Sequence, residues 1–163
     1  MKTFKEFITE AFDSYFPYKW IHIPSNTKTD FLGEFKTTSS LITFEMKNEY
    51  SPDEYEVSFF KLTPNEKYNQ NYNMTGEGES FKVLSTVLKM IYDALQKSKK
   101  LENVNIKKIT FSAEKDQGKG DKKIKTGRAS LYMRMAKKFA KNLGKLDIED
   151  EERSTYFTIT LDK

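Results

Sequence analysis

The residues best suited to hold an anionic ligand lie in a glycine-containing segment near the middle of the chain. Asn73, Thr75, Gly76 and Gly78 fall within the run Asn-Met-Thr-Gly-Glu-Gly, directly before an amphipathic stretch. Glycine lets backbone N–H groups approach a ligand, and the dipole at a helix N-terminus favours an anion such as pyrophosphate. Against this, Glu77 would repel a phosphate, and carboxylates are ordinary residues in a first helical turn. The segment is therefore either a pyrophosphate-binding loop or a structural turn.

A second group of residues with binding chemistry is basic and lies between positions 107 and 145. This segment contains thirteen Lys and Arg against three Asp and Glu, a balance of +10. Helical spacing places Arg134, Lys138 and Lys141 on one face, where they could contact a nucleic acid or an acidic host protein. The alternative is a solvated helix face beside a basic loop, partly balanced by acidic residues 147–152. The candidate contact residues are Lys119, Lys122, Lys123, Lys125, Arg128, Arg134, Lys138 and Lys141.

The residue inventory excludes several kinds of catalytic site. The chain has no cysteine, which rules out a disulfide framework, a thiolate metal site and a cysteine nucleophile. His22 is the single histidine, which excludes a multi-histidine metal site, and a lone histidine in an apolar strand is more often structural. No apolar run reaches the roughly 18 residues of a transmembrane helix. We therefore expect neither a bound metal nor a membrane partner.

Length and composition predict a folded domain. The chain has 163 residues, of which 32% are charged and 37% hydrophobic, so disorder must be considered. The 13 Phe, 9 Tyr and 1 Trp argue against it, because disordered segments contain few aromatic residues. We expect a small core built from large rings, in a single domain over residues 13–163. A short amphipathic helix at residues 1–12 is expected to precede it.

The order of the predicted elements indicates an α+β fold. Apolar alternation predicts strands, and apolar residues spaced three and four apart predict helices. Runs of strands followed by alternating helix and strand predict one mixed, mainly antiparallel sheet with two main helices. The expected elements are an extended stretch at 18–23, strands at 31–37, 41–47, 54–62, 104–112 and 156–161, and helices at 81–100 and 127–143.

The segment from about residue 54 to 161 resembles the C-terminal half of the GNAT-type N-acetyltransferase superfamily. Gly76 and Gly78 match both glycines of that superfamily's pyrophosphate-binding loop, whereas Asn73 stands where the family has Gln or Arg. The resemblance implies a GNAT-like fold and acetyl-CoA as cofactor, bound by the loop at 73–78. It also implies Tyr132 as the general acid toward the CoA thiolate. The alternative for Tyr132 is a core position on the apolar stripe of its helix.

The first eleven residues resemble the capsid-targeting leaders of internal head proteins in large contractile-tailed phages. They are amphipathic and rich in Lys, Thr and Phe, and they contain Ile8-Thr9-Glu10, the type of triplet at which such leaders are cleaved. The resemblance implies a phage protein that is packaged in the capsid interior and delivered to the host cytoplasm, with cleavage after Glu10. The alternative is a plain N-terminal helix, in which Thr3 and Glu6 form a capping box.

Two functions from different classes follow. The first is an enzyme that transfers an acetyl group from acetyl-CoA to an amine. Its catalytic base would be one of Glu45, Glu54 and Glu56, or water held by them, and no pattern in the sequence separates these residues. The second is a non-catalytic binder of nucleic acid or of a host protein through the basic 107–145 surface.

Overall fold

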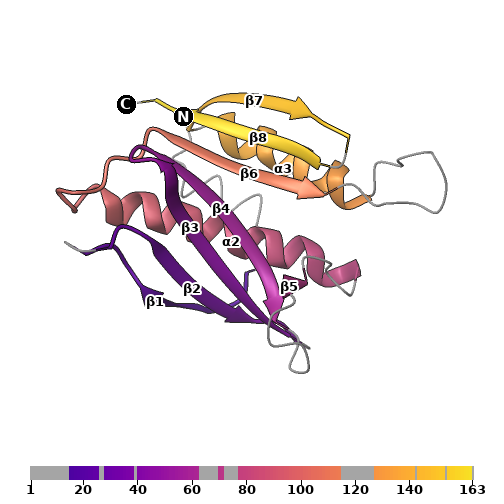
Figure 1. Ribbon diagram of the computed structural model, residues 1–163. Coiled ribbons are helices and arrows are strands. Elements are labelled where there is room, and N and C mark those ends of the chain that lie inside the picture. The colour runs from indigo at the N-terminus through magenta and orange to yellow at the C-terminus, as the bar shows by residue number, and fades with distance from the viewer. Residues whose placement is uncertain are drawn as a thin grey trace. The chain divides into compact units, whose positions relative to one another are not determined.

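The computed structural model describes residues 15–25, 28–38, 40–62, 70–71, 77–114, 127–141, 143–152 and 154–162. The predictions of a helix at 1–12 and of a cleavage site after Glu10 lie outside these residues. The chain divides into two compact units, Met1–Ile106 and Lys107–Lys163 (Figure 1). The single domain expected over residues 13–163 stays a prediction.

The first unit contains an antiparallel sheet built as a meander. Strands β1 (Tyr18–His22), β2 (Phe31–Lys36), β3 (Leu41–Ser51) and β4 (Glu54–Leu62) pair in sequence order, and β5 (Gln70–Asn71) pairs with β4. Successive strands pair antiparallel because a short turn only has to reverse the direction of the chain. Within this unit β1 is the outer strand, bonded to β2 alone among the described strands.

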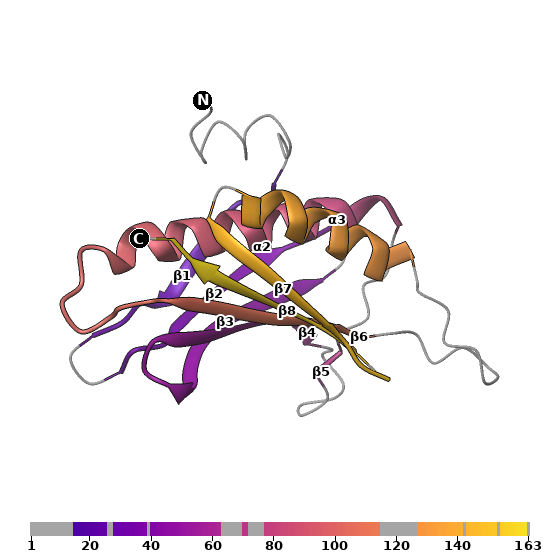
Figure 2. The same cartoon turned by 90° about the horizontal axis from the view of Figure 1, so that it is seen from above.

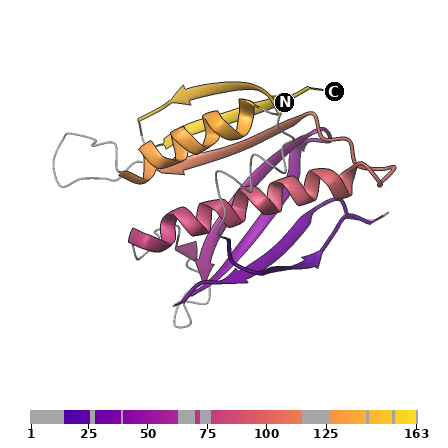
Figure 3. The same cartoon turned by 180° about the vertical axis from the view of Figure 1, so that it is seen from behind.

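Helix α2 (Glu77–Ser98) lies across one face of this sheet (Figures 1 and 3). Side chains alternate between the two faces of a strand, so every second strand residue faces the helix. This alternation was predicted for β3, where Ile42, Phe44 and Met46 are all buried. The helix buries a broad apolar face made of Val83, Leu84, Val87, Leu88, Met90, Ile91, Ala94 and Leu95.

Gly33 allows α2 to approach the sheet closely. A Cβ atom at this position would lie 2.5 Å from Met90 Cε and 3.2 Å from Trp20 Cε3. Both distances are shorter than ordinary van der Waals contact, so any larger residue would displace the helix side chain or the indole. The glycine in β2 thus makes the space in which Trp20 of β1 packs beside α2.

In the second unit three strands pair antiparallel, and a single helix covers one face of them (Figure 2). Strand β8 (Ser154–Leu161) lies between β6 (Lys108–Glu114) and β7 (Gly144–Asp150). Helix α3 (Gly127–Lys141) packs against all three strands. The buried side chains of this unit include Ile109, Ala136, Phe139, Ala140, Phe157 and Ile159.

The prediction of a GNAT-like fold is wrong. The described residues form a strand-rich α+β structure with eight strands and only two helices, and every strand pair within either unit is antiparallel. Strand β7 was not predicted, because its sequence indicated only an acidic run. Leu146 and Ile148 of β7 pair with the buried Ile159 and Phe157. The chain therefore continues from α3 into a hairpin, and not into a single final strand.

Two element boundaries also differ from the predictions. The strand expected at 41–47 continues to Ser51, so only Pro52 and Asp53 remain for the turn between β3 and β4. The strand expected from Val104 begins only at Lys108, although the Val104 side chain is buried. Apolar alternation identified the buried positions in both cases but could not show where backbone pairing begins and ends.

Candidate functional site

The structure places the parts of the predicted acetyl-CoA site in different units. Gly78 lies in the first turn of α2, which belongs to the first unit, whereas Asn73, Thr75 and Gly76 lie outside the described residues. Tyr132 lies in α3 of the second unit, and its side chain is not among those described. Because the GNAT-like fold was the reason for grouping these residues, its correction removes the basis for a shared cofactor site.

Among the eight candidate contact residues of the predicted basic surface, those with described side chains lie on helix α3. Arg134, Lys137, Lys138 and Lys141 are all exposed, and none of them forms an ion pair with a described residue. At 3.6 residues per turn they fall within about 100° of the helix circumference, opposite the buried side. The helix contains no Asp or Glu at all. We call these four residues the α3 stripe; Lys137 joins the three stripe residues predicted from the sequence.

The other predicted basic contacts have less structural support. Lys119, Lys122, Lys123 and Lys125 lie outside the described residues. Arg128 lies in the first turn of α3, and its side chain is not described. The structure therefore places only the C-terminal half of this predicted surface.

Two acidic residues of β7, Asp147 and Glu149, lie on the face of the strand that points away from α3. Leu146 and Ile148 lie on the face of the sheet that α3 covers, since they pair with buried residues of β8. By alternation, Asp147 and Glu149 lie on the opposite face, and both are exposed. The positive helix surface and these carboxylates thus lie on opposite sides of the second unit.

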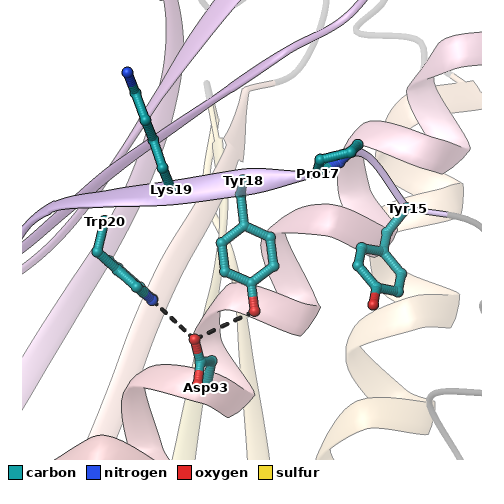
Figure 4. A pocket seen from close by; sticks show the side chains of 6 residues that line it. All are labelled: Tyr15, Pro17, Tyr18, Lys19, Trp20 and Asp93. Carbon is teal, nitrogen blue, oxygen red and sulfur yellow. Dashed lines mark hydrogen bonds between the residues drawn. The ribbon is translucent and has the colours of Figure 1, made fainter.

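A pocket in the first unit was not predicted from the sequence. It is an open depression of about 700 Å³ lined by Tyr15, Pro17, Tyr18, Lys19, Trp20 and Asp93 (Figure 4). Five of these residues come from the segment around the N-terminal end of β1, and Asp93 comes from α2. The dense aromatic spacing was visible in the sequence, but the carboxylate lies more than seventy residues away and could be placed only by the fold.

Asp93 joins the two aromatic residues of β1 to α2. Its Oδ2 atom accepts a hydrogen bond from Trp20 Nε1 at 2.8 Å and another from Tyr18 Oη at 3.2 Å. Burial raises the pKa of the Tyr18 phenol well above its ordinary value of 10.0, and the negative charge of Asp93 raises it further. Tyr18 is therefore a neutral hydrogen-bond donor at all ordinary pH values. Trp20 also packs edge-to-face on Phe31 and Phe44, which holds its ring in place.

Tyr15 forms the outer wall of the pocket and is anchored less firmly. Its side chain is 43% exposed, and its ring lies 6.4 Å from the ring of Tyr18, at an angle of 47°. The ammonium group of Lys89 lies 5.8 Å from the centre of the Tyr15 ring and 5.6 Å from that of Tyr92. These distances fall near the outer limit of a cation–π interaction. One face of the Tyr15 ring thus already lies near a positive charge.

His22, at the end of β1, is half-buried. The Nε2 atom of His22 is buried and has no hydrogen-bond partner in the described part of the chain. No group of three or more His, Cys, Asp or Glu that could hold a metal ion occurs among the residues described. None of the described helices combines the length and the apolar composition needed to cross a membrane.

Comparisons with protein-family models, with curated proteins and with solved structures found no match to this chain.

Proposed function

We propose that this protein binds nucleic acid through the α3 stripe, Arg134, Lys137, Lys138 and Lys141. The observation that carries the proposal is four exposed cations on one helix face, without a carboxylate on that helix and without an ion pair to any described residue. Unpaired surface cations held in a fixed array can replace the counterions that surround a phosphate backbone. The release of these counterions favours binding.

The geometry of the stripe suits a regular polyanion. From Arg134 to Lys141 the helix rises about 10 Å, at 1.5 Å per residue. Duplex DNA carries one negative charge per about 1.7 Å of its axis, so phosphates lie within reach of the stripe in any register. An acidic protein surface would need carboxylates spaced to match. The stripe therefore supports binding to a nucleic acid more than binding to a host protein, and it supports no base-specific recognition.

Acetyl transfer is not proposed. It depended on the resemblance to the GNAT superfamily, and the strand-rich fold contradicts that resemblance. Origin from a phage, packaging in the head and action in the host cytoplasm remain separate proposals, which rest on the N-terminal segment alone.

The test is the salt dependence of binding to a fluorescent DNA duplex, measured by anisotropy on the full chain. Lys137→Glu with Lys138→Glu should weaken binding at least tenfold. It should also make the slope of log K against log salt shallower by about 1.8, at about 0.9 for each phosphate that the variant no longer neutralises.

The matched control is Lys99→Glu with Lys100→Glu, a pair of exposed lysines directly after α2 in the first unit. Each reversal lowers the charge by two, so both double variants bring the formal net charge from +4 to zero. Equal weakening by the two variants would show that net charge alone attracts DNA, and this would refute the stripe. Absent or salt-independent binding by the unmodified chain would also refute it, and selective binding of an acidic protein would favour the other partner class.

A further inference from the structure

We propose that the pocket lined by Tyr15, Tyr18, Trp20 and Asp93 binds an organic cation, either an alkylammonium or a guanidinium group. This site lies entirely in the first unit and is independent of the α3 stripe in the second. Its volume of about 700 Å³ is within the range of small-molecule sites, and three of its six lining residues are aromatic.

The charge of the pocket favours a cation because Asp93 is its only acidic lining residue and no lining cation is left uncompensated. Lys19 extends to the opposite side of β1 from Tyr18 and Trp20 (Figure 4). Its Nζ atom forms an ion pair with Glu34 at 2.9 Å. An anionic ligand would be repelled by the Asp93 carboxylate, whereas a cation would be attracted by it.

Asp93 keeps one oxygen available for a ligand. Both hydrogen bonds from β1 reach Oδ2, and no described residue donates to Oδ1. Trp20 and Tyr18 therefore fix the position of the carboxylate without using its second oxygen. A ligand N–H group could donate to Oδ1 in a hydrogen bond strengthened by the two opposite charges.

The aromatic rings supply the second half of the recognition. The electron-rich face of a Trp or Tyr ring attracts ammonium and guanidinium groups within about 6 Å. Lys89 shows this attraction at Tyr15, although at 5.8 Å from the ring centre. Because the ammonium group of Lys89 would repel a bound cation, Lys89 should weaken the binding of a cationic ligand. Replacing Lys89 with a neutral residue should therefore strengthen the binding of a cationic ligand.

The same chemistry could come from two sources, a lysine or arginine side chain of a partner peptide or a small free amine. Two ligand series distinguish them: end-blocked peptides that contain a single arginine, and butylammonium as a free amine. Citrulline peptide and butanol serve as neutral controls of nearly the same shape. Binding is followed through the indole N–H resonance of Trp20, which is the only tryptophan in the chain.

The expected result is a saturable shift of the Trp20 resonance with the cations and none with their neutral controls. Asp93→Asn, which keeps an acceptor but removes the charge, should weaken binding about tenfold, and Tyr15→Ala should weaken it about threefold to tenfold. Lys89→Met should strengthen it. Tyr156→Ala is the matched control for Tyr15→Ala, since Tyr156 is a tyrosine of nearly equal exposure (42%) in the other unit, and it should have no effect.

Butylammonium and the peptide binding equally would identify a small amine as ligand, and binding by the peptide alone would identify a protein partner. Equal binding of neutral and cationic ligands would overturn the proposal, as would unchanged affinity in Tyr15→Ala or weaker binding in Lys89→Met. Tyr15 and Lys89 make no hydrogen bond to Asp93, so these two variants keep the test valid even if Asp93→Asn proves unstable.

Discussion

The indole N–H of Trp20 donates a hydrogen bond of 2.8 Å to the carboxylate of Asp93, and this bond joins β1 to α2 across seventy-three positions of the chain. Tyr18 donates to the same oxygen from two residues earlier in β1. The outer strand of the first unit is thus held to its helix by two directed bonds as well as by apolar packing. These two bonds hold β1 against α2, and the three residues that form them line the proposed cation pocket.

Removal of the Asp93 carboxylate should destabilise the first unit. Asp93→Ala leaves the two part-buried donors of Tyr18 and Trp20 without their acceptor, at an expected cost of about 1–3 kcal/mol in the free energy of unfolding. Asp93→Asn keeps a carbonyl acceptor and should cost less. Urea unfolding followed by the fluorescence of Trp20 measures the free energy of unfolding in the first unit, which contains this tryptophan. Equal stability of Asp93→Ala and the unmodified chain would show that these bonds contribute nothing.

Alkaline conditions should weaken the first unit through Tyr18. Its pKa is raised in the folded state by burial and by Asp93, so above pH 10 the unfolded chain binds fewer protons than the folded one. Stability is therefore complete below pH 10 and falls as the pH rises, by up to about 1.4 kcal/mol per pH unit for this group.

Tyr18→Phe should make the alkaline loss of stability less steep. Tyr55, whose pKa is raised by burial, and Lys47, whose pKa is raised by its hydrogen bond to Glu45, will still contribute to that loss in the variant. The measurement is the free energy of unfolding in urea between pH 8 and 11.5 for both proteins. Parallel curves for the two proteins would show that Tyr18 does not titrate with folding.

Gly144→Ala should destabilise the second unit. A Cβ atom at Gly144 would overlap the carbonyl oxygen of Thr160, and a backbone atom cannot move aside as a flexible side chain can. The strained start of β7 should cost about 1–3 kcal/mol. Lys145→Ala at the exposed neighbouring position is the control and should be nearly neutral. Far-UV circular dichroism during thermal unfolding is the readout, because Trp20 lies in the other unit.

The N-terminal segment makes a prediction about processing. If residues 1–10 are a capsid-targeting leader, mass spectrometry of purified phage particles should find a chain that begins at Ala11. Glu10→Ala should block this cleavage and leave a longer chain. Particles that contain the protein with Met1 intact would contradict processing, and particles without the protein would contradict packaging.

Much of the first unit was predictable because its signals are local. Alternation over 54–62 defined β4 to the residue, and helical spacing located the buried face of α2. The acidic strand β7 was missed since it contains only two large apolar residues, Leu146 and Ile148. Charged residues are common on the outward side of an outer strand because they prevent pairing with other chains. In β7 they make the apolar alternation that predicts a strand hard to recognise.

The apolar periodicity, the positive charge of the α3 stripe and the absence of cysteine follow from the amino-acid sequence alone, because each of these is a property of residue type and local spacing. The tertiary structure was needed to show that Asp93 lies beside Trp20, that Asp147 and Glu149 face away from α3, and that the order of elements does not produce a GNAT-like sheet. These relationships depend on contacts between segments distant in the chain. Hydrophobic burial brings such segments together, but no local sequence pattern shows which polar groups will then be in contact.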